Sequence, residues 1–328
     1  MKLKANKLLG FINKTFSIKQ NAVWKAQNYA ELLTAAASHS TYLETVNAIT
    51  MPNADTFHYR IGMDTDINRL MHGFAGLTSK QLRKLRGRKV IVIVDYTHEP
   101  FFGKTQNDWV HGYRPVPGSR GCYKFLSASI VAGEQRYFVY AKPVSAITDE
   151  TFELWQILAH LELMGIRIAV MLMDRGIARN SENLALLHDM NIKYLGLYQK
   201  YRNVRKIIRD MKRSFINRKF KVKGIPTRLV IGKEKFTWVF VTNMELGNFF
   251  KYLRLYKKRW NIETGFRVHD EACIKTKSTD IRVRYFLFIA AMLLYNVWKS
   301  LSVKISFKRF VIQMQRVWGV MKDELKPT

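Results

Sequence analysis

The chain has 328 residues, of which 48% are hydrophobic, so the composition excludes a disordered protein and suggests about two domains at the usual ~150 residues per domain. Its 55 Lys and Arg against 25 Asp and Glu leave a net charge of +30, which favours nucleic acid as the partner over an anionic membrane surface. Because Cys122 and Cys273 are the only cysteines, a disulfide framework and a thiolate zinc site are both excluded, and a reducing, intracellular compartment is expected.

Residues 1–88 are predicted to form a helical DNA-binding region. Within 21–50 the apolar positions recur three and four residues apart, and Asn53 and Asp55 after Pro52 are good N-caps for a second short helix. Two helices joined by a tight turn indicate a helix-turn-helix, although many helical hairpins share this outline. A basic helix over 78–89, ending at Gly87, is expected to lead into the next domain.

The second domain is predicted to span residues 89–328 and to have an α/β fold. Its first strand is a continuous β-branched run, which is typical of a strand buried in the middle of a sheet. The predicted order is strand, strand, strand, helix, strand, helix, strand, over 89–95, 122–133, 135–144, 149–164, 166–174, 181–190 and 192–198. Helices are expected over 246–270 and twice more after it. The longest apolar run, 285–298, is shorter than the ~20 residues that span a bilayer, so a buried helix and no membrane partner are expected.

A basic, β-rich insertion over 199–245 interrupts this order. It is predicted to hold a helix and then a hairpin that turns at Gly232 and Lys233. Residues 200–235 contain 14 Lys and Arg but only two acids, whereas a face that needs only solubility usually mixes both signs. We therefore expect this stretch to bind DNA phosphates, through Arg205, Lys206, Arg209, Lys212 and Arg213.

Two aspartates end predicted strands, Asp95 the first and Asp174 the fourth. The carboxyl ends of neighbouring strands meet at one edge of a sheet, so these side chains can converge if the strands are adjacent. Converging carboxylates repel, and a pair of Mg²⁺ ions held by oxygen ligands neutralises them and suits phosphodiester chemistry. The alternative for each aspartate alone is a turn or helix cap. His98 and His111 lack ligand spacing and are expected to be polar loop residues.

A third carboxylate, Glu263, falls inside the predicted helix 246–270. Tyr256, Arg259 and Arg267 are spaced three and four residues from one another and from Glu263, so all four share one helix face. A surface ladder of ion pairs gives the same spacing. An acid flanked by arginines on a partly buried helix is also what a site approached by phosphates requires.

Taken together, these residues resemble the DDE transposases of bacterial and archaeal insertion sequences. The pattern Y-x-x-R-x-x-x-E in YKKRWNIETGFR is similar to the catalytic-helix signature of that family, and DYTHEPFFGK (95–104) and MDRG (173–176) resemble the segments that carry its first two aspartates. The resemblance implies an RNase H-like mixed sheet with flanking helices, in which Asp95, Asp174 and Glu263 ligate two Mg²⁺ ions, with Mn²⁺ as a substitute.

The resemblance also implies roles for other residues of the helix. Tyr256 and Arg259 would support DNA phosphates near the cleavage point. Many members have a lysine seven residues after the glutamate, where this chain has Asp270, so Arg267 or Lys275 is expected to make that distal contact instead.

The implied function is cleavage at the ends of an insertion sequence and strand transfer into target DNA. A homodimer on double-stranded DNA is expected, in the cytoplasm and associated with the nucleoid. The alternatives are an RNase H-like hydrolytic nuclease, which gives no joined product, and a catalytically silent DNA-binding regulator derived from a transposase.

Trp238 has two interpretations. The period of two in KFTWVFV puts Phe236, Trp238 and Phe240 on one face of a strand of the insertion. This face is either a small local core or an aromatic platform. The second is suggested by relatives that excise through a DNA hairpin and stack a flipped base on an aromatic ring of this insertion.

Overall fold

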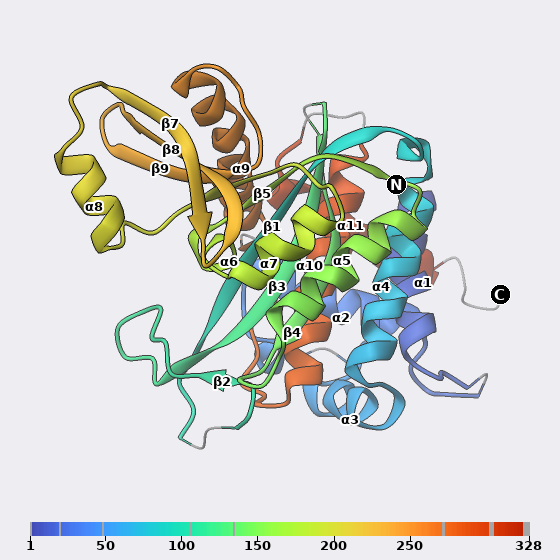
Figure 1. Cartoon of the computed structure of the whole chain (residues 1–328). Helices are drawn as coiled ribbons and strands as arrows, with labels where there is room; N and C mark the ends of the chain where they lie inside the picture. Colours follow the sequence, from blue (N-terminus) through green and yellow to red (C-terminus); the bar gives the residue numbers. More distant parts are fainter. Residues whose placement is uncertain are drawn as a thin grey trace.

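The computed structural model describes residues 2–19, 21–47, 49–104, 107–133, 135–270, 273–301 and 305–323, and within these ranges it does not describe the side chains of 2–5, 260–270 and 319–323. The described strands form one mixed sheet of nine, with helices on both of its faces (Figure 1).

The middle of the sheet has the predicted chain order. The strands are β1 (Lys89–Phe101), β3 (Gly121–Ala132), β4 (Gln135–Val144), β5 (Arg167–Met173) and β6 (Tyr194–Leu197). β3 pairs antiparallel with β1 and β4, whereas β5 runs parallel to both β1 and β6. A two-residue strand, β2 (Val110–His111), adds to β3. The spatial order β4-β3-β1-β5-β6 therefore confirms the predicted mixed sheet.

β1 is longer than predicted. The run of Val and Ile from position 90 to 94 is mostly buried, as expected for a central strand. The strand does not end at Asp95, because its second half continues in register with β3, from Asp95 opposite Ser127 to Phe101 opposite Gly121. Asp95 thus lies in the middle of a strand that is parallel-paired only along its first half.

One face of the sheet is covered by α5 (Glu150–Leu163), α6 (Arg175–Ala178) and α7 (Ser181–Asp189). Val92 and Val94 of β1 point to this side, where they share a core with Leu154 and Leu184. Both long helices begin where the sequence predicts: Asp149 caps α5, and Asn180 caps α7.

The other face is covered by α9 (Phe249–Asp270) and α10 (Ile281–Lys299). α9 packs against β1, β5 and the insertion strands through Tyr252 and Tyr256, and α10 packs on β4. Among the helices that the structure describes, only α10 is long and apolar enough to cross a membrane, and 89% of its most apolar window is buried inside the protein. The predicted buried helix is confirmed.

The N-terminal helices surround α10 together with α11 (Phe307–Asp323), and all of them contribute to one core. They are α1 (Lys2–Thr15), α2 (Ala26–His39), α3 (Ala54–Asp64) and α4 (Ile67–Gln81), with 3-10 turns at Leu43–Thr45 and Arg83–Leu85. The prediction of helix through residue 50 is wrong, because Ser40 takes a left-handed conformation with φ of 50° and ends α2.

Two further N-terminal predictions have different outcomes. The Asn53 cap is confirmed, since the Thr56 amide donates to Asn53 Oδ1 at 2.8 Å. The basic helix over 78–89 is wrong: α4 ends at Gln81. The division into domains 1–88 and 89–328 stays a prediction. Recognition of DNA by α3 also stays a prediction; the exposed face of this helix carries Tyr59 and Met63.

The insertion consists of α8 (Arg202–Arg209) and three strands, β7 (Phe215–Val222), β8 (Ile225–Lys233) and β9 (Thr237–Thr242). Of these strands the sequence predicted only the β8–β9 hairpin. The predicted turn at Gly232 and Lys233 is too early in the sequence, because these residues still pair with Trp238 and Thr237. β9 pairs with β6, so the insertion extends the central sheet (Figure 1).

Candidate active site

The register between β1 and β5 brings the two predicted aspartates together. Val94 of β1 pairs with Met173 of β5 as the last parallel pair, and Asp95 and Asp174 follow directly. The two carboxylates therefore emerge at the same point of the sheet, where β5 ends and β1 continues. The two strands are adjacent, which is the condition on which the sequence allowed these aspartates to converge.

Asp174 is also a helix cap. Its Oδ1 accepts a hydrogen bond from the Ile177 amide at 2.9 Å and starts α6. The capping interpretation is thus correct for this residue. The capping hydrogen bond uses only Oδ1 of Asp174. Within the described part of the chain Oδ2 accepts no hydrogen bond, so the half-buried carboxylate can still serve as a metal ligand.

Asp95 is buried and is paired with Arg259 of α9. Arg259 Nη1 lies 2.5 Å from Asp95 Oδ2, and each side chain is 11% exposed. The other carboxylate oxygen, Oδ1, accepts from the Tyr96 amide at 2.9 Å. α9 thus places a cation on the first aspartate, at the position that a metal ion would need to share or take over.

Tyr256 supports Arg259 from one turn earlier on α9. Its ring is fully buried, packed 5.1 Å from the ring of Phe240, and the guanidinium of Arg259 lies 5.4 Å from its centroid. Burial raises the pKa of Tyr256, and the nearby Arg259 partly opposes this. The tyrosine is therefore buried against Arg259, and its expected support of DNA phosphates stays a prediction.

Arg136 of β4 is a fourth charged residue near this site, which the sequence reasoning missed. It donates from Nη2 to Ser129 Oγ at 2.9 Å and interacts electrostatically with Asp95 and Arg259. Burial lowers the pKa of Arg136 to about 9, so it remains protonated at neutral pH. An arginine directly before the apolar run YFVYA in this strand is the sequence signal for it.

The third predicted ligand is placed by its backbone alone. Glu263 and Arg267 lie in α9, one and two turns after Arg259, but their side chains are outside the described residues. Among the side chains that are described, no group of three His, Cys, Asp or Glu could hold a metal ion. The described part of the candidate centre therefore consists of two carboxylates, Asp95 and Asp174, and of Arg259, which is paired with Asp95.

Trp238 lies beneath α9 in the core. It is 9% exposed and stacks on Phe240 at 5.9 Å between centroids. Phe236 is instead 72% exposed and lies in the β8–β9 turn, so the prediction that it shares a strand face with the other two rings is wrong. This geometry favours the local-core interpretation of Trp238 over the base platform.

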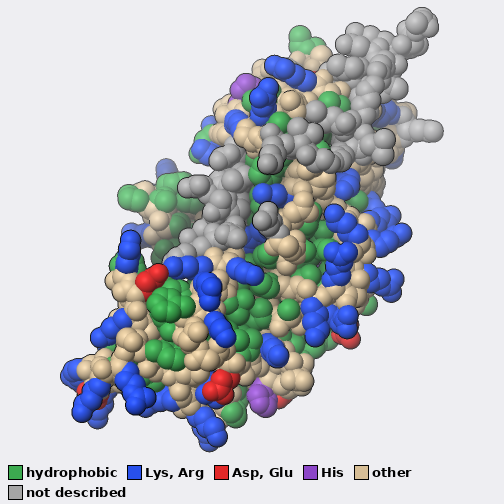
Figure 2. Space-filling view, turned by 90° about the horizontal axis from the view of Figure 1, so that it is seen from above, with side chains coloured by type: hydrophobic (Ala, Val, Ile, Leu, Met, Phe, Trp, Pro, Cys, Tyr) green, Lys and Arg blue, Asp and Glu red, His purple; other side chains and the backbone are tan. Residues whose placement is uncertain are grey.

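The predicted phosphate contacts of the insertion lie on the surface. Lys and Arg side chains are spread over the face shown in Figure 2, with few acids between them. The predicted contacts in α8 and in the segment after it are all exposed: Arg205, Lys206, Arg209, Lys212 and Arg213. Lys275 is exposed too, but it lies elsewhere, in the segment that follows α9.

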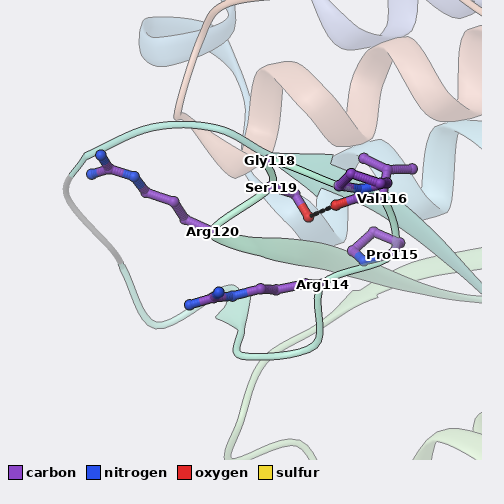
Figure 3. A pocket seen from close by; sticks show the side chains of 7 residues that line it. Arg114, Pro115, Val116, Gly118, Ser119 and Arg120 are labelled. Carbon is purple, nitrogen blue, oxygen red and sulfur yellow. Dashed lines mark hydrogen bonds between the residues drawn. The ribbon is translucent and has the colours of Figure 1, made fainter.

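The predicted loop histidines belong to strands. His98 is in β1, with its ring 5.0 Å from that of Tyr113, and His111 Nε2 in β2 donates to the Val144 carbonyl at 2.6 Å. The loop between β2 and β3 folds on itself, since Ser119 Oγ donates to the Val116 carbonyl (Figure 3). The hollow that this loop lines has a volume of about 630 Å³ and starts about 20 Å along β1 from Asp95, at ~3.3 Å per residue.

Comparison with known proteins agrees with this geometry. Residues 85–297 match the model of a family described as the transposase DDE domain. The fold is similar to that of a piggyBac transposase in a synaptic complex with hairpin DNA, with a TM-score of 0.69, 11% identity, and coverage of 99% of this chain and 82% of that one. A Drosophila P element transposase strand transfer complex aligns with a TM-score of only 0.30, at 12% identity over 93% of this chain and 65% of that one. No curated protein sequence matches the chain.

Proposed function

Because the chain belongs to the DDE transposase family, we propose that it cuts DNA at the ends of an insertion sequence and joins the resulting 3′-hydroxyls to target DNA. The observation that carries this proposal is the register that sets Asp95 beside Asp174, with α9 laid across them. Glu263, one turn after Arg259, is proposed as the third carboxylate.

The donor chemistry at the site fits a divalent metal ion, which this family uses. Asp95 and Asp174 offer only oxygen ligands, which Mg²⁺ prefers, and their like charges need a counter-charge that Arg259 supplies to just one of them. Two bound ions would activate the attacking water or 3′-hydroxyl and stabilise the leaving oxygen. We propose Mg²⁺ as the natural ion and Mn²⁺ as its substitute.

The protein's own residues would then have separate roles in holding the metal ions and in binding DNA. Asp95 and Asp174 hold the centre rigidly, one by its buried strand position and the other by its helix cap. Arg259, once released from Asp95, can bind a DNA phosphate through its planar fork of donors. Tyr256 keeps that guanidinium at the site in both states.

DNA is proposed to run from this centre over the insertion. The cations of α8 and β7 supply affinity that does not depend on sequence, as phosphate contacts do. We further propose that two copies of the chain act together on the two ends of the element, in the cytoplasm at the nucleoid.

The proposal is tested with labelled DNA carrying the sequences that border the gene, incubated with an unlabelled target plasmid. Cleavage at the border and a joined product are expected with Mg²⁺ or Mn²⁺, and neither with EDTA. Cleavage without any joined product would identify a hydrolytic nuclease instead, and binding without cleavage would identify a regulator.

A further inference from the structure

A second site lies beside the candidate active site. A cavity of about 650 Å³ opens between the second half of β1, the segment 273–279 that follows α9, and the start of α10. This volume lies within the ~300–1,000 Å³ of typical ligand pockets. Lys275, which the resemblance suggests for a distal phosphate contact, is among its lining residues, whereas the proposed metal ligands Asp95 and Asp174 are not.

The cavity is a continuation of the active-site face of β1. Asp95, Thr97 and Glu99 alternate onto one side of the strand, and the last two line the cavity. At about 3.3 Å per residue, Thr97 lies ~7 Å and Glu99 ~13 Å along the strand from Asp95. Since a stacked DNA strand advances about 3.4 Å per nucleotide, this corresponds to roughly two to four nucleotides from a phosphate held at Asp95.

The walls combine aromatic rings with cations. Phe102 is 58% exposed and Tyr42 is 39% exposed, while Lys275 and Lys277 are exposed beside them. The acid in the lining, Glu99, is neutralised by an ion pair with Arg284 of α10. Rings that offer a stacking surface next to exposed lysines are the combination that binds an unpaired base and its phosphate.

The lining residue Thr97 carries a buried hydroxyl. Thr97 Oγ1 is buried and, within the described part of the chain, has no hydrogen-bond partner. A hydroxyl left in this state is costly unless a ligand completes it. An exocyclic group or ring nitrogen on the edge of a base would do so.

The lysine-bearing wall is held in place before any ligand arrives. The Lys275 carbonyl accepts from the Leu43 amide at 2.8 Å, and Glu44 Oε1 accepts from the Lys277 amide at 2.9 Å. From the other side, Arg284 Nε donates to the Ser278 carbonyl at 2.7 Å. Such preorganisation lowers the cost of binding.

We propose that this cavity binds one or two unpaired nucleotides of the DNA strand that passes Asp95. This inference rests on the proposed function, because it takes DNA as the substrate of the neighbouring centre. Single-stranded DNA is favoured over duplex, because only unstacked bases offer their faces to Phe102 and Tyr42.

The test measures binding in EDTA, so that no cleavage occurs. Fluorescein-labelled oligodeoxythymidylate of ten nucleotides and a random ten-base-pair duplex are titrated with the full chain, and anisotropy is read. Phe102→Ala is expected to weaken oligodeoxythymidylate binding by about 5- to 100-fold, the effect of removing one base stack, with less than a twofold change for duplex. Lys277→Ala should lower the slope of log affinity against log salt for the single strand by about 0.7.

Matched controls are Phe236→Ala, which removes another exposed ring, in the β8–β9 turn, and Lys80→Ala, which removes an exposed cation of α4. Both should leave single-strand binding unchanged. The proposal is overturned if Phe102→Ala and Phe236→Ala have the same effect, or if Phe102→Ala weakens duplex binding as much as single-strand binding. A chain that binds the oligomer through Phe102 yet never cleaves DNA would contradict the proposed function and leave the cavity's role standing.

Discussion

The guanidinium of Arg259 lies 2.5 Å from the carboxylate of Asp95, although 164 residues separate them in the sequence. In the state described, this buried ion pair neutralises the first proposed metal ligand. Any ion that binds Asp95 therefore competes with, or rearranges, Arg259. Helix α9 and strand β1 are thus joined at the proposed catalytic site.

Removing Arg259 should make the stability of the protein depend on metal. Arg259→Ala leaves a buried carboxylate unpaired, which typically costs about 3–5 kcal/mol. We expect a large drop in melting temperature in EDTA and substantial recovery in millimolar Mg²⁺, because the ion replaces the missing counter-charge. Arg282→Ala, which breaks the half-exposed pair with Asp280, is the control and should show no such recovery. An equal decrease with and without Mg²⁺ would argue against Asp95 as a ligand.

Replacing Trp238 should act through stability. Its ring is 9% exposed in the core beneath α9, so Trp238→Ala is expected to lower the free energy of unfolding by about 3–5 kcal/mol and to reduce every reaction step together. Denaturant unfolding and the rates of first nick and second-strand cleavage measure this. Phe236→Ala, on the exposed turn, should change stability by less than about 0.5 kcal/mol. A stable variant that is slow only in the second cleavage would restore the base platform.

The cations of α8 should control salt-dependent affinity. Replacing Arg205, Lys206 and Arg209 by Ala is expected to weaken binding to any duplex and to reduce the slope of log affinity against log salt by about 0.9 for each phosphate that the variant no longer neutralises. Arg83→Ala, an exposed cation near the end of α4, serves as the control. If the triple variant keeps the wild-type slope, the DNA does not follow the insertion.

His160 should make the fold less stable in mild acid. Burial lowers the pKa of His160 below its usual 6.5, so below that pH the unfolded chain binds a proton that the folded chain does not. The free energy of unfolding therefore falls as the pH drops below about 6.5, by ~1.4 kcal/mol for each unit of difference between the two pKa values. His160→Leu should flatten the decrease in melting temperature between pH 7 and 5, whereas His188→Gln, at a half-exposed site, should not. An unchanged slope in His160→Leu would exclude this cause.

The sequence predicts those parts of the fold whose environment is uniform along the element. The run Val90 to Val94 is buried, so its apolar pattern is continuous and identifies a central strand. β7 escaped prediction because it is exposed on one side and its cations interrupt the pattern. The end of β1 was misplaced because pairing with β3, not local sequence, extends it to Phe101.

The candidate site divides in the same way. Asp95, Asp174 and Arg259 could be named from the sequence because each follows or lies within a recognisable local pattern. The ion pair between Asp95 and Arg259 could not be predicted from the sequence, because it depends on how α9 lies across the sheet. The cavity at Lys275 likewise depends on the backbone pairing of that segment with Thr41 and Leu43.

The most direct test of the account is single-turnover cleavage of border DNA in Mg²⁺ by Asp95→Asn, Asp174→Asn and Glu263→Gln, measured beside DNA binding. Each amide removes one ligand charge and nearly keeps the shape of the side chain. Changes outside a metal's own ligands already cost about 10- to 100-fold, so a decrease of at least ~100-fold in cleavage is expected with duplex affinity unchanged. Asp189→Asn, on an exposed acid at the end of α7, should cleave like the wild type. Wild-type cleavage by the three amide variants would contradict the assignment of these carboxylates as the catalytic centre.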